Sequence, residues 1–593
     1  MKLSMTSVAI ILALCTGLVG CNSSDTESEK TLTVLAAATP ASLQNCDGLL
    51  NNFSFDDTEI TSAELVAAGD IDYNGRGEIF TAPEHCVVTG EMEPRLGTGL
   101  LGAEDQVYTI KFEMRLPTNW SGRYLYQANG GLDGRVNKAV GRFMTTVAKD
   151  ASALNKGFAV ISSDAGHEGY GLQYFGLDHQ ARVNYGYQAV AKLTPMAKSL
   201  IESAYGKQPD RSYFTGCSNG GRHSMVAATR YADQYDGFLV GNPGNDLPQA
   251  AVSQLYGVQQ FATLIPAGTA LDSASAITAA VQATVTSEEY DLVANAVIKQ
   301  CDGLDGAADG MISNTLACQD AFDLDRDVAT CSSDRDGTCL TAAQKVALGN
   351  IMQGPQKSDG TGLYVNFPYD VGMGASGWAS WEMVNAFSRD AGTVATVFST
   401  PPVEFTDYNT QGDAGLIEAY QYAVNLDMDA ADAAINNTTS EFPESSMQFM
   451  ALNGETEYAT LRDRGAKMIV LHGTSDPVFS VQNTINWYQA VDEANTGTAT
   501  DFAKLYLMPG MNHCGGGPAT DQVNTILDDI VAWVEQGEAP EAIVANARAT
   551  NTELPADWSA ERSRPLCPFP KVATYNGSGD MESAASFSCQ IPQ

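Results

Sequence analysis

Segments with the composition of β-strands alternate with helical segments near both ends of the chain, and this alternation restricts the chain to the α/β class of folds. Helices with amphipathic spacing are expected at 183–204, 221–233 and 520–536. Between about 245 and 462 the pattern becomes helical and loop-like, with little β alternation. The sequence therefore predicts an α/β core interrupted by a large insertion. The expected strands are 108–117, 123–131, 157–167, 211–216, 237–244, 466–476 and 503–514.

Residues 216–220, Gly-Cys-Ser-Asn-Gly, fit the pattern G-x-S-x-G, which places a serine on a sharp turn from a strand into a helix. The strand expected before this segment and the helix expected after it supply that context. Gly220 and Gly221 permit close backbone approach. Ser218 is therefore a candidate nucleophile. The alternative is an ordinary turn that contains a serine.

A serine nucleophile needs a base within hydrogen-bond reach and an acid that orients the base. His513 follows a strand-like segment near the end of the α/β pattern, and Asp476 ends the preceding expected strand. The chain order Ser218, Asp476, His513 is the order of α/β-hydrolases. Asp164 also lies at a strand end, but it precedes the serine and ranks below Asp476. For His513 the alternative is a loop histidine bonded to backbone groups.

Cysteines flank both the candidate nucleophile and the candidate base. Cys217 precedes Ser218, and Cys514 follows His513. If the triad forms, these two cysteines come close enough for a disulfide. Such a bridge would tie the nucleophile to its base and restrict how far the two can drift apart.

The chain has a formal net charge of -38. This charge repels phosphate groups and argues against nucleic acid or an anionic membrane surface as a partner. A solvated acidic surface is the ordinary interpretation, and such a surface also favours cations such as calcium.

The first residues have the features of an export signal. Residues 1–20 combine an early lysine with an apolar run of signal-peptide length, too short for a comfortable membrane span. Leu-Val-Gly-Cys at 18–21 resembles a bacterial lipobox, so Cys21 is expected to be lipidated and 21–42 to form a flexible tether. We expect an outer-membrane lipoprotein, on its periplasmic or cell-surface side, that touches the membrane only through this anchor. Ordinary secretory cleavage is the alternative.

Export favours disulfides over free thiols. Without Cys15 and Cys21, ten of the twelve cysteines remain. None of their spacings matches a C-x-x-C zinc or redox motif, so five bridges are the economical interpretation.

The Cys217-Ser218, Asp476 and His513-Cys514 arrangement resembles the signature of the tannase and feruloyl esterase family, over nearly the whole mature chain. The resemblance implies an α/β-hydrolase core at 43–244 and 463–593 with an inserted lid domain at 245–462. It also implies a serine carboxylesterase acting on small esters of aromatic acids, of the feruloyl or hydroxycinnamoyl, galloyl or terephthalate type. The implied disulfides are Cys46–Cys86, Cys217–Cys514, Cys301–Cys318, Cys331–Cys339 and Cys567–Cys589.

Two backbone N–H groups are expected to hold the oxyanion. One belongs to Asn219, and the other to Gly131 or Gly130 in the segment Asn-Gly-Gly-Leu-Asp-Gly. A plain turn is the alternative for this glycine pair. His472 resembles a family position near the substrate, and the alternative is a histidine that only braces the acid loop.

The segment 301–318 presents aspartates separated by glycines, which suits the oxygen ligands of calcium. Its spacing is not that of an EF-hand, and a solvated Asp-Gly turn is the alternative. The resemblance implies a calcium ion in this loop. Its role is expected to be structural, because the segment is far along the chain from the triad and has no obvious water-activating geometry. The implied ligands are the side chains of Asp302, Asp305 and Asp309 and the carbonyl oxygens of Ala307 and Met311.

The physiological ester and the oligomeric state are left open by these patterns. Arg389, in the aromatic-rich segment 372–398, is either a partner for a substrate carboxylate or part of a structural ion pair. A non-catalytic lipoprotein that binds aromatic glycosides for uptake is the alternative function, but it predicts the loss of a triad residue. A peptidase or thioesterase shares the triad without the cysteine and calcium-loop pattern.

Overall fold

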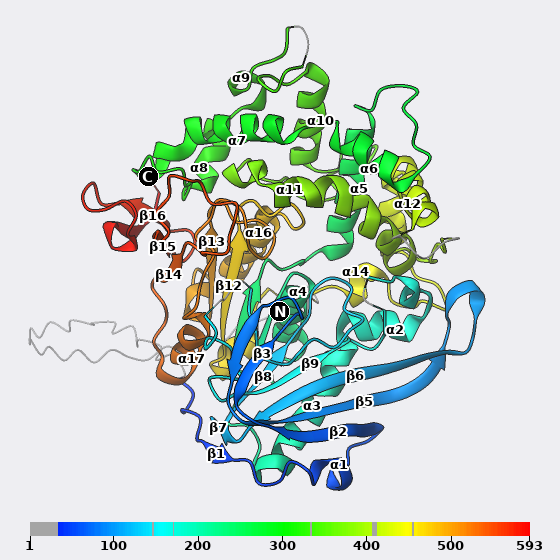
Figure 1. The fold of residues 1–593 in the computed structure, drawn as a ribbon, viewed down its shortest axis with the longest axis vertical. Helices are drawn as coiled ribbons and strands as arrows, with labels where there is room; N and C mark the ends of the chain where they lie inside the picture. The colour runs from blue at the N-terminus through cyan, green and yellow to red at the C-terminus, as the bar shows by residue number, and fades with distance from the viewer. Residues whose placement is uncertain are drawn as a thin grey trace, which may run out of the picture. The chain divides into compact units, whose positions relative to one another are not determined.

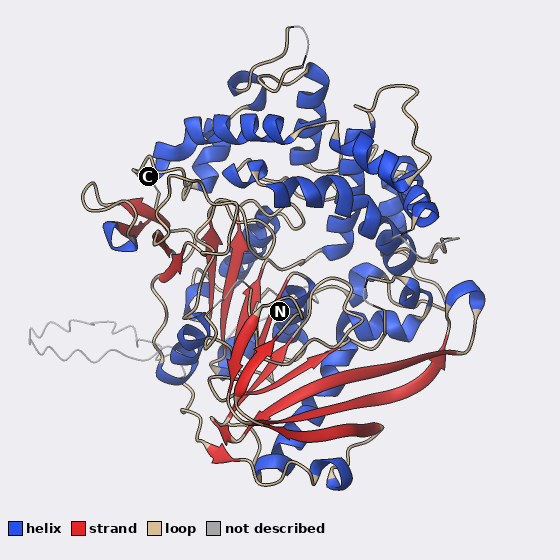
Figure 2. Cartoon of the chain, viewed as in Figure 1, coloured by secondary structure: helices blue, strands red, loops and turns tan. Residues whose placement is uncertain are grey.

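A nine-stranded sheet forms the centre of the computed structural model, which describes residues 34–592 except 145–147, 170, 333–334, 406–411 and 453–455. Six neighbouring strands are parallel, and three further strands continue the sheet in antiparallel fashion. All seven predicted strands lie in this sheet (Figures 1 and 2). The parallel strands, in spatial order, are β13 (Ala503–Met508), β12 (Lys467–Gly473), β11 (Gly237–Gly241), β10 (Arg211–Cys217), β8 (Arg123–Gln127) and β9 (Ala159–Ser163). The antiparallel strands are β6 (Gln106–Pro117), β5 (His85–Gly97) and β2 (Thr58–Val66).

Helices bury both faces of the parallel strands, as a parallel sheet requires. Because successive side chains of a strand point to opposite faces, Tyr126 of β8 packs on one face and Leu125 on the other. The first face is covered by α3 (Ala189–Tyr205), α4 (Asn219–Arg230) and α16 (Val481–Ala494). The second is covered by α17 (Ile526–Gln536), whose Trp533 is buried.

The chain leaves the sheet after β11 and returns to it at β12. Within the described residues between these strands, the only β-type pairings are isolated bridges. Helices of this stretch gather at the end of the sheet to which β12 and β13 point (Figure 1), and they contribute most of one large apolar cluster. The exact boundaries of the predicted lid remain a prediction. The longer helices are α5 (Leu247–Ala262), α6 (Ala274–Gln282), α7 (Ser287–Cys301), α8 (Thr315–Ala321), α10 (Ala342–Gln353), the π-helix η6 (Trp381–Asp390), α12 (Asp413–Asn425) and α13 (Met428–Asn436).

Some elements have no clear signal in the sequence. Strand β2 is mostly exposed and carries polar residues, so its apolar alternation is weak. The helix expected at 183–204 is divided into α2 (His179–Val183), the π-helix η3 (Asn184–Gln188) and α3. Four two-stranded sheets pair β1 (Ala41–Ser42) with β7 (Asn119–Trp120), β3 (Gly69–Asp72) with β4 (Ile79–Ala82), β14 (Ile543–Asn546) with β15 (Ser563–Leu566), and β16 (Val572–Tyr575) with β17 (Phe587–Gln590).

The predicted signal peptide, Cys21 and the first part of the tether lie outside the described residues. In the described ranges, no helix is long and apolar enough to cross a membrane.

Candidate active site

Ser218 lies on the turn between β10 and α4, at the carboxyl end of the parallel sheet. Its backbone has φ 67° and ψ -129°, a strained conformation for a residue with a side chain. The turn is tight, since a Cβ atom on Gly216 would lie 2.4 Å from the backbone of Gly220. The Ser218 N–H donates to the Gly241 carbonyl oxygen (3.0 Å), which holds the turn against β11.

The candidate base and acid meet Ser218 in one continuous hydrogen-bonded chain. His513 Nε2 lies 2.8 Å from Ser218 Oγ, and His513 Nδ1 lies 2.8 Å from Asp476 Oδ2. The three residues follow β10, β12 and β13, whose carboxyl ends share one edge of the sheet. Nδ1 can donate to the carboxylate while Nε2 accepts from the serine hydroxyl, as proton removal from serine requires.

The Asp476 carboxylate is fully enclosed and richly hydrogen-bonded. Its Oδ1 accepts from the N–H groups of Val478 (2.8 Å) and Phe479 (3.1 Å), and its Oδ2 also accepts from Asn242 Nδ2 (2.7 Å). Burial alone would raise the pKa of Asp476, but His513 and the hydrogen bonds around the carboxylate hold it below its usual range. Asp476 is therefore ionised and oriented toward the histidine.

The competing acid, Asp164, is engaged elsewhere. Its Oδ1 accepts from the N–H groups of Lys111 (3.0 Å) and Gly166 (2.9 Å) at the end of β9. Burial raises the pKa of Asp164 well above its usual range, the opposite of what an orienting carboxylate needs.

His472 lies behind the acid rather than on a cleft wall. It is fully buried, its Nε2 donates to the Phe479 carbonyl oxygen (2.9 Å), and its Nδ1 pairs with the Thr484 hydroxyl (2.8 Å). His472 Nε2 also lies 3.4 Å from Asp476 Oδ2. These contacts favour the alternative in which His472 braces the acid loop, and leave no surface for a substrate.

Five disulfides occur in the structure, and they are the five pairs implied by the family resemblance. The bridge Cys217–Cys514 joins the two residues next to Ser218 and His513 across 297 positions of sequence. The nucleophile and the base are therefore linked covalently through their chain neighbours.

Two aromatic rings enclose His513. Trp381 of η6 and Phe479 each present an edge-on ring whose centroid lies 5.3 Å from that of the imidazole. Trp381 belongs to the inserted helices and Phe479 to the core, so the two parts of the chain meet over the histidine. Both rings pack against the imidazole, which restricts its rotation.

The glycine pair lies beside the nucleophile. A Cβ on Gly130 would stand 3.5 Å from the Cβ of Ser218, and Gly131 has a left-handed backbone with φ 66°. Gly131 and Ser218 line the same clefts, and Asn219 begins helix α4 directly after the serine. The predicted oxyanion residues are thus gathered around Ser218.

A buried polar network, with no signal in the sequence, connects the two sides of this region. Asp133, two residues after Gly131, accepts at Oδ2 from Asn219 Nδ2 (2.9 Å) and contacts His223 Nε2 (2.9 Å). Arg222 Nε donates to Asn219 Oδ1 (2.8 Å). Burial holds the pKa of Asp133 well above its usual range, and the opposing effects of Arg222 and the Asn219 amide are smaller. The network joins the start of α4 to the glycine loop.

Two clefts meet at Ser218. The narrow cleft is mainly apolar and includes Tyr185, Phe398 and Phe479. The wide cleft has a volume of about 1070 Å³ and includes His513 and Trp381. Gly131 and Arg389 line both clefts.

Arg389 forms a bidentate ion pair with Asp390 (2.7 and 2.8 Å), and its guanidinium lies over the ring of Trp381. The structural ion pair, one of the two alternatives for Arg389, is therefore present.

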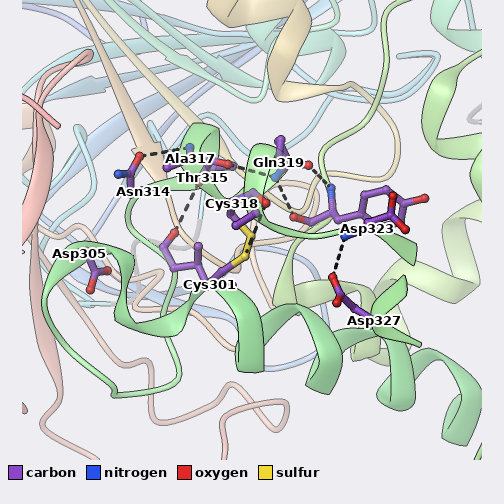
Figure 3. The surroundings of a disulfide bond; sticks show 12 residues. Cys301, Asp305, Asn314, Thr315, Ala317, Cys318, Gln319, Asp323 and Asp327 are labelled. Atoms are coloured by element: carbon purple, nitrogen blue, oxygen red, sulfur yellow. Dashed lines mark hydrogen bonds between the residues drawn. A yellow bond between two sulfur atoms is a disulfide. The ribbon is translucent and has the colours of Figure 1, made fainter. Parts of the chain in front are cut away.

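The predicted calcium residues lie in the loop between α7 and α8, which the Cys301–Cys318 disulfide closes (Figure 3). Asp302 Oδ1 accepts from the N–H groups of Asp309 (3.0 Å) and Gly310 (2.9 Å), and Asp309 is paired with Arg564. Burial raises the pKa of Asp305 to about 6. Across the described residues, no three His, Cys, Asp or Glu side chains already converge as metal ligands do.

Comparisons with known proteins agree with this geometry. The model of the family described as "Tannase and feruloyl esterase" matches residues 86–590. Mono(2-hydroxyethyl) terephthalate hydrolase of Piscinibacter sakaiensis is 35% identical over 551 residues, 86% of this chain and 85% of that protein. Feruloyl esterase B of Aspergillus niger is 24% identical, over 93% of this chain and 97% of its own.

Comparison with solved structures finds proteins of the same family. The crystal structure of feruloyl esterase B from Aspergillus oryzae matches 92% of this chain and 99% of its own, with a TM-score of 0.68 and 22% identity. The α/β-hydrolase core with a lid is thereby confirmed. The chain belongs to the tannase and feruloyl esterase family and is a carboxylic ester hydrolase.

Proposed function

We propose that this protein hydrolyses esters of aromatic acids through an acyl-enzyme, with Ser218 as nucleophile, His513 as base and Asp476 as the acid that orients the base. The observation that carries the proposal is the hydrogen-bonded chain from Asp476 through His513 to Ser218, at 2.8 Å for each contact. The names of the relatives, a terephthalate monoester hydrolase and a feruloyl esterase, support an aromatic acid as the acyl component.

In the first half of the reaction, Ser218 Oγ attacks the ester carbonyl carbon as its proton passes to His513 Nε2. The tetrahedral intermediate collapses, the bond to the alcohol oxygen breaks, and His513 returns the proton to the leaving alcohol. Water then attacks the acyl-serine with His513 again as base, which releases the acid and restores the Ser218 hydroxyl. Asp476 remains ionised throughout and stabilises the imidazolium.

The negative charge of the tetrahedral intermediate needs backbone donors close to Ser218. The N–H of Asn219 and that of Gly131, or of Gly130, are proposed for this role. The strained turn at Ser218 and the close approach of Gly130 support it. Loss of one such donor typically lowers the rate about a hundredfold or more.

The narrow cleft has a volume of only about 40 Å³, so it is proposed to contact one edge of an aromatic acyl group that lies mainly in the wide cleft beside Ser218. Its walls include the rings of Tyr185, Phe398 and Phe479, which suit offset or edge-on contacts with another ring. Phe479 also touches His513, so a ring bound there lies next to the catalytic groups.

A structural calcium ion is proposed for the loop at 301–318, with no part in the chemistry. Three carboxylates belong to one short loop, and burial raises the pKa of Asp302 and Asp305, which supports a hard cation as their compensating charge. Arg564 already balances Asp309, so the ion would chiefly compensate the other two carboxylates. The side chains of Asp302, Asp305 and Asp309 with the carbonyl oxygens of Ala307 and Met311 would hold it.

Export with lipidation at Cys21 is also proposed, from the lipobox-like segment at 18–21. The disulfides among the described cysteines support an oxidising compartment. Loss of metabolic fatty-acid labelling in the Cys21→Ala variant, with the protein found free of the membrane fraction, is the expected result. Equal labelling of both proteins would contradict it.

The esterase proposal is tested with the purified mature protein on methyl gallate, methyl ferulate and mono(2-hydroxyethyl) terephthalate, with Ser218→Ala as the control. Turnover of at least one aromatic ester, abolished in Ser218→Ala, is expected. Turnover that survives the substitution, or no turnover of any of the three, would overturn the proposal.

A further inference from the structure

Glu382 is a buried glutamate beside the tryptophan that contacts the candidate base. It is the second residue of the π-helix η6 and is only 1% exposed. Trp381, the residue before it, presents an edge-on ring to His513, with 5.3 Å between the ring centroids. The reaction proposed above gives Glu382 no part. A buried ionisable group this close to a reactive centre often has a role in it.

No basic side chain pairs with the Glu382 carboxyl group in the described part of the chain. The charges that act on it are those of Asp390 and Asp476, which have the same sign as its own carboxylate form. Arg389, on the same helix, is paired with Asp390. The carboxylate form of Glu382 would therefore be a buried charge without a counterion, which is costly.

The helices that pack against η6 supply no basic side chain either. The helices α5, α6, α11 (Ser376–Ser380) and the π-helix η7 (Thr393–Phe398) contain no Lys, Arg, His, Asp or Glu, and α12 contains only Asp413 and Glu418. Burial raises the pKa of the tyrosines of these helices, so they stay neutral near pH 8: Tyr256, Tyr420 and Tyr422. From α7 the neighbouring group is the hydroxyl of Tyr290, whose pKa burial also raises.

Three buried polar atoms in this region lack a hydrogen-bond partner among the described residues. They are Glu382 Oε1, Gln254 Oε1 and the hydroxyl oxygen of Tyr290. The Gln254 side chain, from α5, interacts with the Glu382 carboxyl group. An ionised carboxylate only accepts hydrogen bonds, so it cannot satisfy the Gln254 oxygen, whereas a protonated carboxyl group carries an O–H donor. The protonated form of Glu382 therefore suits these surroundings better.

The acid–base equilibrium of Glu382 agrees with this environment. Burial raises the pKa of Glu382 from 4.5 to about 8, and the charges of Asp390 and Asp476 act in the same direction, while the Gln254 side chain opposes them. At pH 7 the carboxyl group is therefore mostly protonated and neutral. Above pH 8 it becomes an unpaired negative charge inside the protein.

The surroundings of Glu382 lead to both partners of the nucleophile. Gln254 Nε2 donates to the carbonyl oxygen of Pro477 (2.8 Å), the residue directly after Asp476. On the other side, η6 carries the Trp381 ring against His513. The carboxyl group also lies close against α5, since a Cβ atom on Gly257 would stand 3.3 Å from Glu382 Oε2. A charge at this position would therefore disturb the packing of η6 on α5.

We infer that Glu382 is a positioning residue that acts in its protonated form, in which it keeps η6 packed on α5 and the Trp381 ring against His513. Ionisation loosens this junction and the link from Gln254 to the acid loop, so turnover falls reversibly in alkaline solution. The inference rests on the proposed esterase function and adds a pH-dependent element to the same site.

The test is the pH dependence of kcat between pH 6 and pH 9, on the methyl ester that is turned over fastest and with Ser218→Ala as the blank for spontaneous hydrolysis. In the native protein we expect kcat to fall about tenfold between pH 7 and pH 9, as the protonated fraction of one group falls. Glutamine has the shape of protonated glutamate and stays neutral, so the ratio of kcat at pH 7 to kcat at pH 9 should drop to about one in Glu382→Gln.

Unfolding by denaturant gives a second readout that does not depend on turnover. Between pH 4.5 and pH 8 the native protein holds a proton on Glu382 that the unfolded chain releases, so the contribution of Glu382 to stability falls as the pH rises. Glu382→Gln should remove this fall. A pH dependence of stability that is the same in the native protein and in Glu382→Gln would contradict the inference.

Glu289→Gln is the matched control for Glu382→Gln. Glu289 is fully buried in the inserted region, but it is paired with Arg335. Its substitution should lower stability and keep the ratio of kcat at pH 7 to kcat at pH 9 near its native value. A constant native kcat from pH 7 to pH 9, or an alkaline loss that persists in Glu382→Gln, would overturn the inference and leave the esterase function intact. No turnover of any ester would overturn both.

Discussion

Cys217 and Cys514 form a disulfide that joins the residue before Ser218 to the residue after His513, across 297 positions of sequence. The hydrogen bond between Ser218 and His513 is therefore bracketed by a covalent link. The disulfide thus holds together the strand end that carries Ser218 and the loop that carries His513, one residue away from each of them.

Removal of this bridge should impair both stability and turnover. For Cys217→Ser with Cys514→Ser, the loop-entropy model predicts a loss of about 5–6 kcal/mol in the free energy of unfolding, as an upper estimate. We also expect kcat to fall at least tenfold, because the base is no longer tied to the nucleophile. Denaturant unfolding and steady-state kinetics measure the two effects.

The control is Cys331→Ser with Cys339→Ser, which opens a loop of only 8 positions in the inserted region. The same model assigns it about 2–3 kcal/mol, and kcat should change little. Equal losses of kcat in the two double variants would contradict a specific role for the bridge Cys217–Cys514.

Asp133 should act as a positioning residue for the oxyanion donors. Asp133→Asn weakens the link from the glycine loop to Asn219 and His223, so we expect kcat to fall about tenfold to a hundredfold with KM nearly unchanged. Affinity for an aryl boronic acid, whose adduct with serine is tetrahedral, should fall in parallel with kcat.

Asp236→Asn is the matched control for Asp133→Asn. Asp236 is also buried, but its Oδ2 accepts from the Ser212 N–H (2.8 Å) near the opposite end of β10. Its loss should lower stability without a change in the ratio of boronate to substrate affinity. A parallel change of kcat and boronate affinity in both variants would assign Asp133 a merely structural role.

Buried His167 should make a contribution to stability that is lost in acid. Burial lowers the pKa of His167 from 6.5 to about 3, so between these values the unfolded chain binds a proton that the native protein excludes. The contribution of His167 to stability therefore rises with pH across this window, by at most about 1.4 kcal/mol per pH unit. Denaturant unfolding at pH 4.5, 5.5, 6.5 and 7.5 measures the slope.

His167→Gln should flatten this dependence, because glutamine does not titrate and keeps a donor for the Leu132 carbonyl oxygen, which His167 Nε2 contacts at 2.7 Å. His179→Gln, at a half-buried position, should leave more of the slope in place. A slope that is unchanged in His167→Gln would exclude this histidine as its source.

Calcium should stabilise the protein without acting in the reaction. We expect EGTA to lower Tm by several degrees and added calcium to restore it, because a ligand that binds only the native state shifts unfolding by mass action. Initial rates at 25 °C should not change. Asp305→Asn should abolish the calcium-dependent shift, whereas Asp320→Asn, at an exposed residue of α8, should retain it. A Tm independent of calcium in the native protein would overturn the calcium proposal.

Local patterns in the sequence predicted the strands of the sheet core and the turn at Ser218. The strands of that core are buried on both faces, so they read as continuous apolar runs bounded by glycine and polar residues. β2 and β5 were not predicted. β2 is mostly exposed and lacks clear alternation, whereas burial does alternate along the first part of β5, so that strand was a missed signal. The chain order of Ser218, Asp476 and His513 was visible because each follows a strand of this kind.

Tertiary structure alone decided what surrounds those residues. Asp133 reaches Asn219 across 86 positions, and Trp381 of the inserted helices packs on His513 of the core. Both contacts depend on how separate elements dock, which no local period encodes. The wide cleft is likewise lined by positions from Tyr73 to Cys514 that share no motif. The sequence by itself therefore determined the fold class and the order of the reactive residues, whereas packing between distant segments decided their orientation and the shape and charge of the clefts.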